Sequence, residues 1–344
     1  MITTDSIIRE DAVSTTTIHH PIHLLDRVAM MALRLMVASM KGSVNGPSAR
    51  EPFDELMEKT PTADGITYEG AEVGGVAGWW CRPDDAIAGA ALLYFHGGAY
   101  VAGSARAYRH FVGQIAARAK VMAFVPEYGL APEHPFPAAV DDAQACYRGL
   151  VEKGFGKIAL AGDSAGGGLA LALLSSLVAK ARDVSAFRPV GAAVMSPWTD
   201  LALSGMSMET RAEADPLLTK ESLASTARLY LGGHDPRDPL ASPLYGDLAG
   251  LPPVRVHVGE DEVRLASSRR ANRKPGQDRR DPYVAGHDPC LPFQRRSPTR
   301  CQGSARRYRQ LPAATIRWRP RRCRQFDEPL NSDDITEYVR SNLR

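Results

Sequence analysis

The sequence has few cysteines and no long apolar run. Its five cysteines follow no regular metal-binding or disulfide spacing, which indicates free thiols in a reducing compartment. The N-terminus lacks the short basic start and the following apolar run of a secretory signal peptide. Residues 23–40 are the only membrane candidate, but charged side chains keep every apolar run in them below the ~18–20 residues of a span. We therefore expect a cytoplasmic protein without stable membrane insertion, in which this segment is a lid or surface helix.

Charge is unevenly distributed in an otherwise ordinary globular composition. The 344 residues carry a net charge of +3 and are 44% hydrophobic. Residues 264–326 nevertheless contain 18 Lys and Arg against 3 Asp and Glu, which leaves 24 basic and 36 acidic residues in the rest of the chain. This segment also has seven prolines and no hydrophobic periodicity, so its sequence specifies neither a strand nor a helix.

Strand and helix patterns alternate along the middle of the chain. Residues 66–83 are typical of antiparallel strands, and apolar runs predict further strands at 89–95, 120–128, 157–162, 189–198 and 251–261. Helical patterns lie between them at 107–119, 135–154 and 167–182. This alternation favours a mostly parallel sheet with helices on both faces.

The strongest chemical motif is the pentapeptide Gly-Asp-Ser-Ala-Gly at 162–166. It lies where a predicted strand turns directly into a predicted helix, which is the context of a nucleophilic serine on a tight turn. Side chains at the two flanking positions would collide in such a turn, and this explains the glycines. Ser164 is therefore the predicted nucleophile, and the alternative is a helix-capping serine in a glycine-rich turn.

A second motif, His-Gly-Gly-Ala-Tyr at 96–100, follows the predicted strand 89–95. Acyl transfer builds negative charge on the carbonyl oxygen, which backbone N–H groups stabilise by about 3 kcal/mol per donor. Adjacent glycines let the main chain approach that oxygen closely. We predict the N–H groups of Gly97, Gly98 and Ala165 as the donors of this oxyanion hole. His96 is expected to anchor the loop rather than to act as a base.

Together with EYGLAPEHPFPAA (127–139), SPWTDL (196–201) and DPLL (215–218), these motifs resemble the hormone-sensitive-lipase-like, or GDXG, family of α/β hydrolases. The resemblance covers residues 60–265. It implies an α/β-hydrolase fold with a mostly parallel, eight-stranded sheet and helices on both faces. It also implies carboxylester hydrolysis by a catalytic domain at 61–344, under a helical cap from 1–60 and 200–232. One departure is Gly129, where the family usually has arginine, which affects the anchoring of the oxyanion loop.

The acid of a catalytic triad should follow the strand at 251–259. Residues 259–263 supply it, and the family pattern matches Glu262, with Asp261 as the alternative. The alternative interpretation is that Glu262 and Asp261 are both solvated acids on a loop and that neither belongs to a triad. Asp215 precedes this strand and is expected to be the N-cap residue of a helix in the segment that covers the active site.

The base is the weakest part of the pattern, because His287 is the only histidine after Glu262 and its surroundings do not match the family. The basic segment around it, 266–326, is best explained as translation in a shifted reading frame. A one-base shift of codons for residues 286–292 can read Gly-Met-Thr-His-Val-Phe, which is similar to the family's histidine motif. Residues 333–343 then again have the pattern of an amphipathic helix. A basic tail for nucleic acid or acidic membranes is the competing interpretation.

The predicted activity is hydrolysis of short- to medium-chain carboxylic esters through an acyl-enzyme on Ser164, with Glu262 and His287 completing the triad. No metal or organic cofactor is implied. The expected partner is a small-molecule ester, without nucleic acid, and a homodimer is left open. Two alternatives remain: a hydrolase relative impaired by loss of its histidine motif, and a binding module that uses the basic tail.

Overall fold

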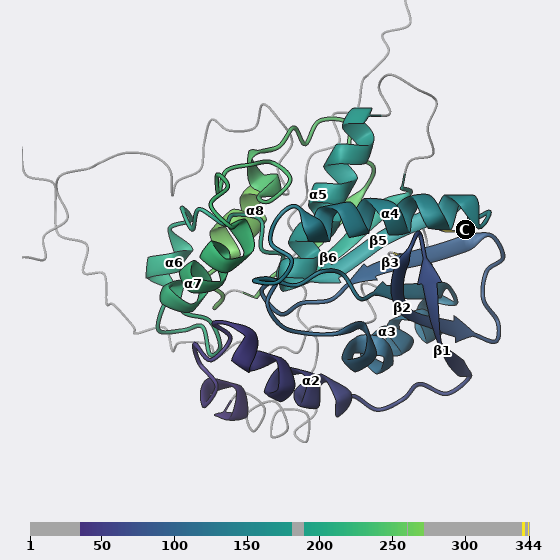
Figure 1. Ribbon diagram of the computed structural model, residues 1–344, viewed down its shortest axis with the longest axis horizontal. Helices are drawn as coiled ribbons and strands as arrows, with labels where there is room; N and C mark the ends of the chain where they lie inside the picture. The colour runs from purple at the N-terminus through teal and green to yellow at the C-terminus, as the bar shows by residue number, and fades with distance from the viewer. Residues whose placement is uncertain (1–34, 181–188, 260, 272–338, 341–342, 344) are drawn as a thin grey trace, which may run out of the picture. The chain divides into compact units, whose positions relative to one another are not determined.

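The computed structural model (Figure 1) describes residues 35–180, 189–259, 261–271, 339–340 and 343. These residues form an α/β-hydrolase fold built around one sheet, and each strand predicted from the sequence is present with shifted ends. The strands are β1 Ile66–Val73, β2 Val76–Pro83, β3 Ala90–Phe95, β4 Met122–Pro126, β5 Lys157–Asp163, β6 Gly191–Met195 and β7 Val254–His257.

The strand order is β1-β2-β4-β3-β5-β6-β7. β2 is antiparallel to β1 and β4, whereas the strands from β4 to β7 are parallel to their neighbours. The described residues thus contain seven strands where the family resemblance implied eight. Phe95 pairs with Gly162, and Asp163 pairs with Met195. The loops after β3, β5 and β6 therefore leave the sheet at the same edge, and they carry the motifs of the candidate site.

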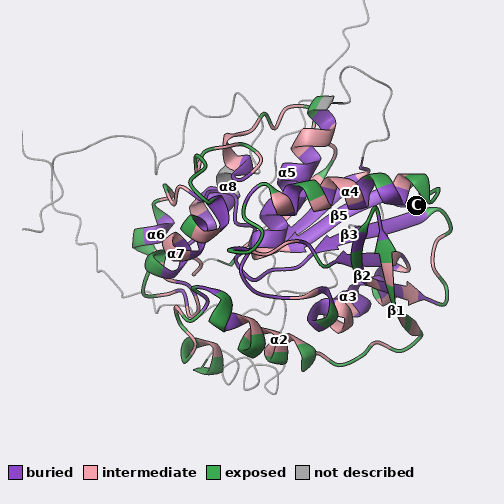
Figure 2. Ribbon diagram, viewed as in Figure 1, coloured by how far each residue is buried: buried purple, intermediate pink, exposed green. Residues whose placement is uncertain are grey.

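The central strands are covered on both faces. Every residue of β3 is buried, and its side chains alternate between two hydrophobic clusters. Leu93 and Phe95 belong to one cluster, and Leu92 and Tyr94 belong to the other. Figure 2 shows buried residues along the strands and exposed residues on the outer helix surfaces. A continuous apolar run is what a strand between two helical layers requires.

Three long helices form those layers. They are α3 Ala105–Ala119, α4 Ala138–Glu152 and α5 Ser164–Lys180. Apolar residues of α3 belong to one cluster, and apolar residues of α4 and α5 belong to the other, which Figure 1 shows as helices on opposite sides of the sheet. α3 begins where the Ser104 hydroxyl accepts the N–H of Ala107 at 3.1 Å. This is the usual stabilisation of a helix start.

The segment at 200–232 is only partly helical. It contains turns, the short helix α6 Ser207–Thr210 and the longer helix α7 Lys220–Leu231. α7 begins with a capping box between Thr219 and Ser222. Near its end, Tyr230 stacks on Tyr100 with ring centroids 3.8 Å apart. This contact brings α7 against the loop that follows β3.

At the N-terminal side, residues 1–34 lie outside the described residues. The described part of the expected 1–60 cap contains η1 Pro47–Ala49 and α2 Arg50–Glu58. α2 has no buried residue. None of the described helices is long and apolar enough to cross a bilayer.

The expectation of irregular structure from residue 266 is wrong at its start. After η2 Pro243–Tyr245 and β7, residues Leu265–Ala271 form helix α8, and both Ser267 and Ser268 are buried. The helix can be buried here because its serine hydroxyls have acceptors: Ser268 Oγ donates to the carbonyl of Pro197 at 3.2 Å, and Ser267 Oγ donates to that of Arg264 at 3.0 Å. Residues 272–326 lie outside the described part. In the predicted terminal helix, Val339 and Leu343 are helical and buried in the cluster beside α3.

Candidate active site

Ser164 lies at the junction of β5 and α5, where the sequence predicted a nucleophile. Its φ of 53° is a strained value for a residue with a side chain. A Cβ on Gly162 would lie 2.5 Å from the Gly166 carbonyl oxygen, and one on Gly166 would lie 2.0 Å from the Phe95 carbonyl oxygen. The flanking glycines therefore allow this turn to pack tightly against the end of β3. Ser164 itself is half-buried.

His96 anchors the loop after β3, as expected. It is fully buried, and its Nδ1 donates to the carbonyl of Gly97 at 2.8 Å. Tyr128 stacks on the imidazole with centroids 4.3 Å apart, and its hydroxyl donates to the His96 carbonyl at 2.7 Å. Burial lowers the pKa of His96 to about 4, so the ring is neutral at physiological pH. None of these contacts reaches Ser164.

The N–H of Gly97 is not available as an oxyanion donor, contrary to the sequence prediction. It donates to Asp163 Oδ1 at 3.0 Å. The same carboxylate accepts the hydroxyl of Tyr94 at 2.9 Å and that of Tyr108 at 3.0 Å. Burial raises the pKa of Asp163, while its hydrogen bonds and the Arg264 charge act in the opposite direction. Asp163 thus ties the nucleophile turn to the base of the oxyanion loop.

The backbone geometry favours a donor that the sequence analysis missed. Gly98, Ala99 and Tyr100 all have positive φ values, of 117°, 55° and 62°. Within the described chain, no hydrogen bond is donated by the N–H of Gly98 or of Ala99. Ala165 lies in the first turn of α5, where N–H groups have no acceptor inside the helix. The candidate donors are therefore Gly98, Ala99 and Ala165.

The oxyanion loop is anchored from outside by Arg50, at the start of α2. Its Nε donates to the carbonyl of Val101 at 2.9 Å, and its Nη2 donates to that of Ala131 at 3.0 Å. It also forms an ion pair with Glu133 at 2.5 Å. The guanidinium thereby joins the loop to the segment in which Gly129 replaces the family's usual arginine. The Gly129 N–H donates to Asp142 at 2.8 Å.

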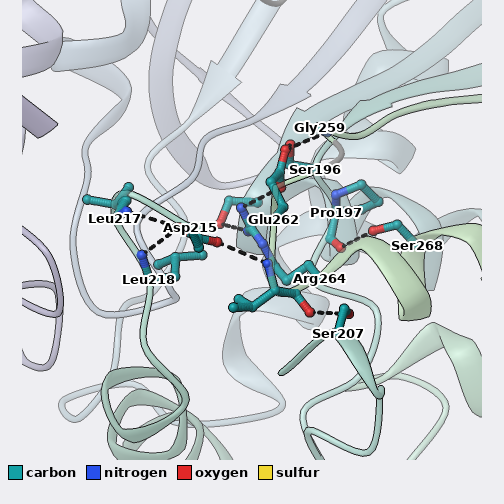
Figure 3. A network of polar contacts seen from close by, with 12 residues as sticks. Ser196, Pro197, Ser207, Asp215, Leu217, Leu218, Gly259, Glu262, Arg264 and Ser268 are labelled. Carbon is teal, nitrogen blue, oxygen red and sulfur yellow. Dashed lines mark hydrogen bonds and ion pairs between the residues drawn. The ribbon is translucent and has the colours of Figure 1, made fainter. Parts of the chain in front are cut away.

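Glu262 lies on the turn after β7, beside β6. Its Oε1 accepts the hydroxyl of Ser196 at 2.5 Å and the N–H of Gly259 at 2.8 Å. Its Oε2 lies 3.4 Å from Nη2 of Arg264. Figure 3 shows these contacts converging on the carboxylate. Asp261, the alternative acid, is half-buried on the same turn.

Arg264 is the residue that joins the candidate acid to the candidate nucleophile. Its Nη1 donates to Ser164 Oγ at 2.6 Å, and its Nη2 approaches Glu262. The side chain is only 8% exposed. A guanidinium has no acceptor atom and stays charged, so it cannot remove a proton from serine. Arg264 is not among the site residues predicted from the sequence, where its only signal is a cation two positions after the predicted acid.

His287, the predicted base, lies outside the described residues. In the described part of the chain, the hydrogen-bond partner of Ser164 Oγ is Arg264 and not a histidine. The structure therefore brings Ser164, the oxyanion loop and Glu262 to one edge of the sheet, with an arginine between the serine and the acid.

Asp215 does not cap a helix, because α7 begins at Lys220 with Thr219 as its N-cap. Asp215 Oδ1 instead accepts the N–H groups of Leu217 and Leu218, and its Oδ2 accepts the N–H of Val263 at 3.0 Å. Figure 3 shows this aspartate between the two segments. It connects the 200–232 segment to the turn that carries Glu262.

Comparison with known proteins agrees with this fold. A sequence profile described as alpha/beta hydrolase fold matches residues 92–281. An acetyl-hydrolase of Streptomyces hygroscopicus is 44% identical over 217 residues, covering 62% of this chain and 69% of its own. An esterase of Acinetobacter venetianus is 34% identical, covering 67% and 76%. A solved esterase of the bacterial hormone-sensitive lipase family is 40% identical with a TM-score of 0.63, covering 72% and 81%. The chain therefore belongs to the hormone-sensitive-lipase-like family of α/β-hydrolase carboxylesterases.

Proposed function

We propose that this chain hydrolyses short- to medium-chain carboxylic esters through an acyl-enzyme on Ser164. The observation that carries the proposal is the strained turn at Ser164, which lies beside a loop with N–H groups available to an oxyanion. The activities for which the relatives are named, acetyl-hydrolase and esterase, support a carboxylic ester as substrate and favour a short acyl group.

In the proposed reaction, Ser164 Oγ attacks the ester carbonyl carbon and a proton leaves the hydroxyl. The developing negative charge is stabilised by the N–H groups of Gly98, Ala99 and Ala165. The tetrahedral intermediate collapses and releases the alcohol, whose oxygen takes up the proton that the serine lost. Water then attacks the acyl-enzyme by the same route and releases the carboxylic acid.

The proposed proton acceptor is the imidazole of His287, with Glu262 holding its tautomer. For this to happen, the hydrogen bond between Arg264 and Ser164 must break, because the guanidinium occupies the space between the serine and Glu262. Without that exchange the serine lacks a base, and such a loss costs several orders of magnitude in rate.

The Arg264 contact also favours a second candidate, a hydrolase relative that binds esters but turns them over poorly. In this candidate, the place beside Ser164 Oγ is taken by Arg264, a residue that cannot accept a proton.

A fluorophosphonate probe and p-nitrophenyl esters test both candidates on the full chain. The first candidate predicts a covalent label on Ser164, found by mass spectrometry of the peptide, together with turnover of p-nitrophenyl butyrate. Ser164→Ala should lose both signals, and His287→Ala should lose turnover. A folded sample that takes up no label would contradict the proposed function. Labelling of Ser164 without turnover of the ester would support the second candidate, the impaired hydrolase relative.

A further inference from the structure

Arg264 is a buried cation whose hydrogen-bonding capacity is largely unused. Its side chain is 8% exposed, and its approach to Glu262 is long at 3.4 Å. Its Nε has no hydrogen-bond partner among the described residues. A buried charge of this kind is unfavourable unless charge-assisted hydrogen bonds satisfy it.

The neighbouring carboxylates satisfy this cation only in part, because Glu262 Oε2 accepts from it at a long 3.4 Å and other donors hold the remaining oxygens. Glu262 Oε1 accepts bonds from Ser196 and Gly259. Asp163 accepts bonds from Gly97, Tyr94 and Tyr108. The shortest contact of the guanidinium is therefore with a neutral hydroxyl, that of Ser164, at 2.6 Å.

Backbone donors are present in the segments next to Ser164. α5 has 17 residues and begins at Ser164 itself, so its N-terminus and the positive end of its dipole lie beside the serine. The N–H groups of Gly98 and Ala99 donate no hydrogen bond within the described chain. A guanidinium thus contacts the half-buried Ser164 hydroxyl, and the backbone N–H groups without an acceptor belong to the two segments tied together at Asp163.

We propose that Arg264 makes this site a receptor for the carboxylate of a small monocarboxylic acid. One carboxylate oxygen accepts from the Arg264 guanidinium, in place of the Ser164 hydroxyl, and the other accepts from the backbone N–H groups of the oxyanion loop and of Ala165. This rests on the proposed function, in which such an acid is the second product. An imidazole at this place would lose its positive charge near neutral pH, whereas arginine keeps it. The site therefore retains its acid product.

Calorimetric titration of the full chain with sodium butyrate tests the proposal, with butyramide as the uncharged ligand of the same shape. Butyrate should bind saturably, and butyramide should not. Arg264→Gln should weaken butyrate binding at least about tenfold, and Arg264→Lys should weaken it less. The control Arg82→Gln removes an equal charge at an exposed ion pair with Glu69 on the β1–β2 hairpin and should bind as the wild type does.

Glu262→Gln is a variant that should bind butyrate more tightly than the wild type, a result that misfolding cannot explain. Removing the nearby negative charge should tighten butyrate binding severalfold. Binding to the wild type should also change little between about pH 6 and pH 9, since the guanidinium does not titrate there. Loss of binding around pH 7 would instead assign it to a histidine and overturn the proposal.

Two other results would overturn the proposal: wild-type protein that binds no butyrate, or Arg264→Gln that binds it as tightly as the wild type. Fluorophosphonate labelling separates these results from failure of the proposed function. A labelled Ser164 without butyrate binding contradicts only the carboxylate site. Butyrate binding that depends on Arg264, in a protein that takes up no label, contradicts only the esterase reaction.

Discussion

Replacement of Asp163 should separate its hydrogen bonds from its charge. Its carboxylate accepts three buried donors, the N–H of Gly97 and the hydroxyls of Tyr94 and Tyr108. Asp163→Ala leaves all three donors without an acceptor. Such a loss of a buried carboxylate lowers the free energy of unfolding by about 3–5 kcal/mol. Asp163→Asn keeps one oxygen for Gly97 and Tyr94 and lets its amide donate to Tyr108, so its cost should be about 1 kcal/mol.

The two substitutions should differ in reactivity as well as in stability. Without its bond to Asp163, Gly97 no longer ties the oxyanion loop to the nucleophile turn, and fluorophosphonate labelling of Ser164 should slow about tenfold or more. Asp163→Asn should label at nearly the wild-type rate. Because burial raises the pKa of Asp163, a neutral side chain of this shape fits the site.

Urea unfolding followed by tryptophan fluorescence measures the stability difference, and time-resolved probe labelling measures the reactivity difference. Asp85→Asn is the matched control, because Asp85 forms an exposed ion pair with Lys120 and its replacement should leave stability nearly unchanged. The reasoning is refuted if Asp163→Ala unfolds within about 1 kcal/mol of the wild type and labels equally fast.

Three further predictions concern packing and buried polar groups. Gly166→Ala should abolish soluble expression or lower the melting temperature severely, because its Cβ would lie 2.0 Å from a backbone oxygen. Gly156→Ala, with nothing within 4 Å of its Cβ, should be tolerated. Burial lowers the pKa of His96 from 6.5 to about 4, so the unfolded chain binds its proton first and stability falls as the pH drops from 6.5 to 4. Urea titrations at several pH values measure the free energy of unfolding of the wild type and of His96→Asn. The difference between the two should fall by roughly 3 kcal/mol from pH 6.5 to pH 4, and a constant difference would contradict this. The buried Tyr230 hydroxyl has no hydrogen-bond partner among the described residues, so Tyr230→Phe should leave the melting temperature unchanged or raise it. Tyr128→Phe should lower it by the equivalent of about 1 kcal/mol, since it loses a 2.7 Å bond to the His96 carbonyl.

Local patterns were sufficient to predict the tight strand-to-helix turn at Ser164 and the anchoring contacts of His96. Glycines are needed around Ser164 because any side chain there would collide with the neighbouring backbone. The motif by itself therefore indicates the tight turn in which it lies. The apolar run of β3 and the helical patterns beside it likewise predicted a sheet covered on both faces. These features depend on residues close together in the sequence, and for that reason they can be predicted from sequence alone.

The details of the candidate site depended on contacts between distant segments. Gly97 and Asp163 are 66 residues apart, and their hydrogen bond removes one predicted oxyanion donor. Arg264 and Ser164 are 100 residues apart, and their contact fills the place next to the serine with a cation. Asp215 turned out to support the turn carrying Glu262 through Val263. No periodicity or motif encodes such contacts, because they arise only when the parallel strands bring their carboxyl ends to one edge of the sheet. The sequence by itself thus determined the fold and the tight turn at Ser164, whereas the tertiary structure decided which groups surround that serine.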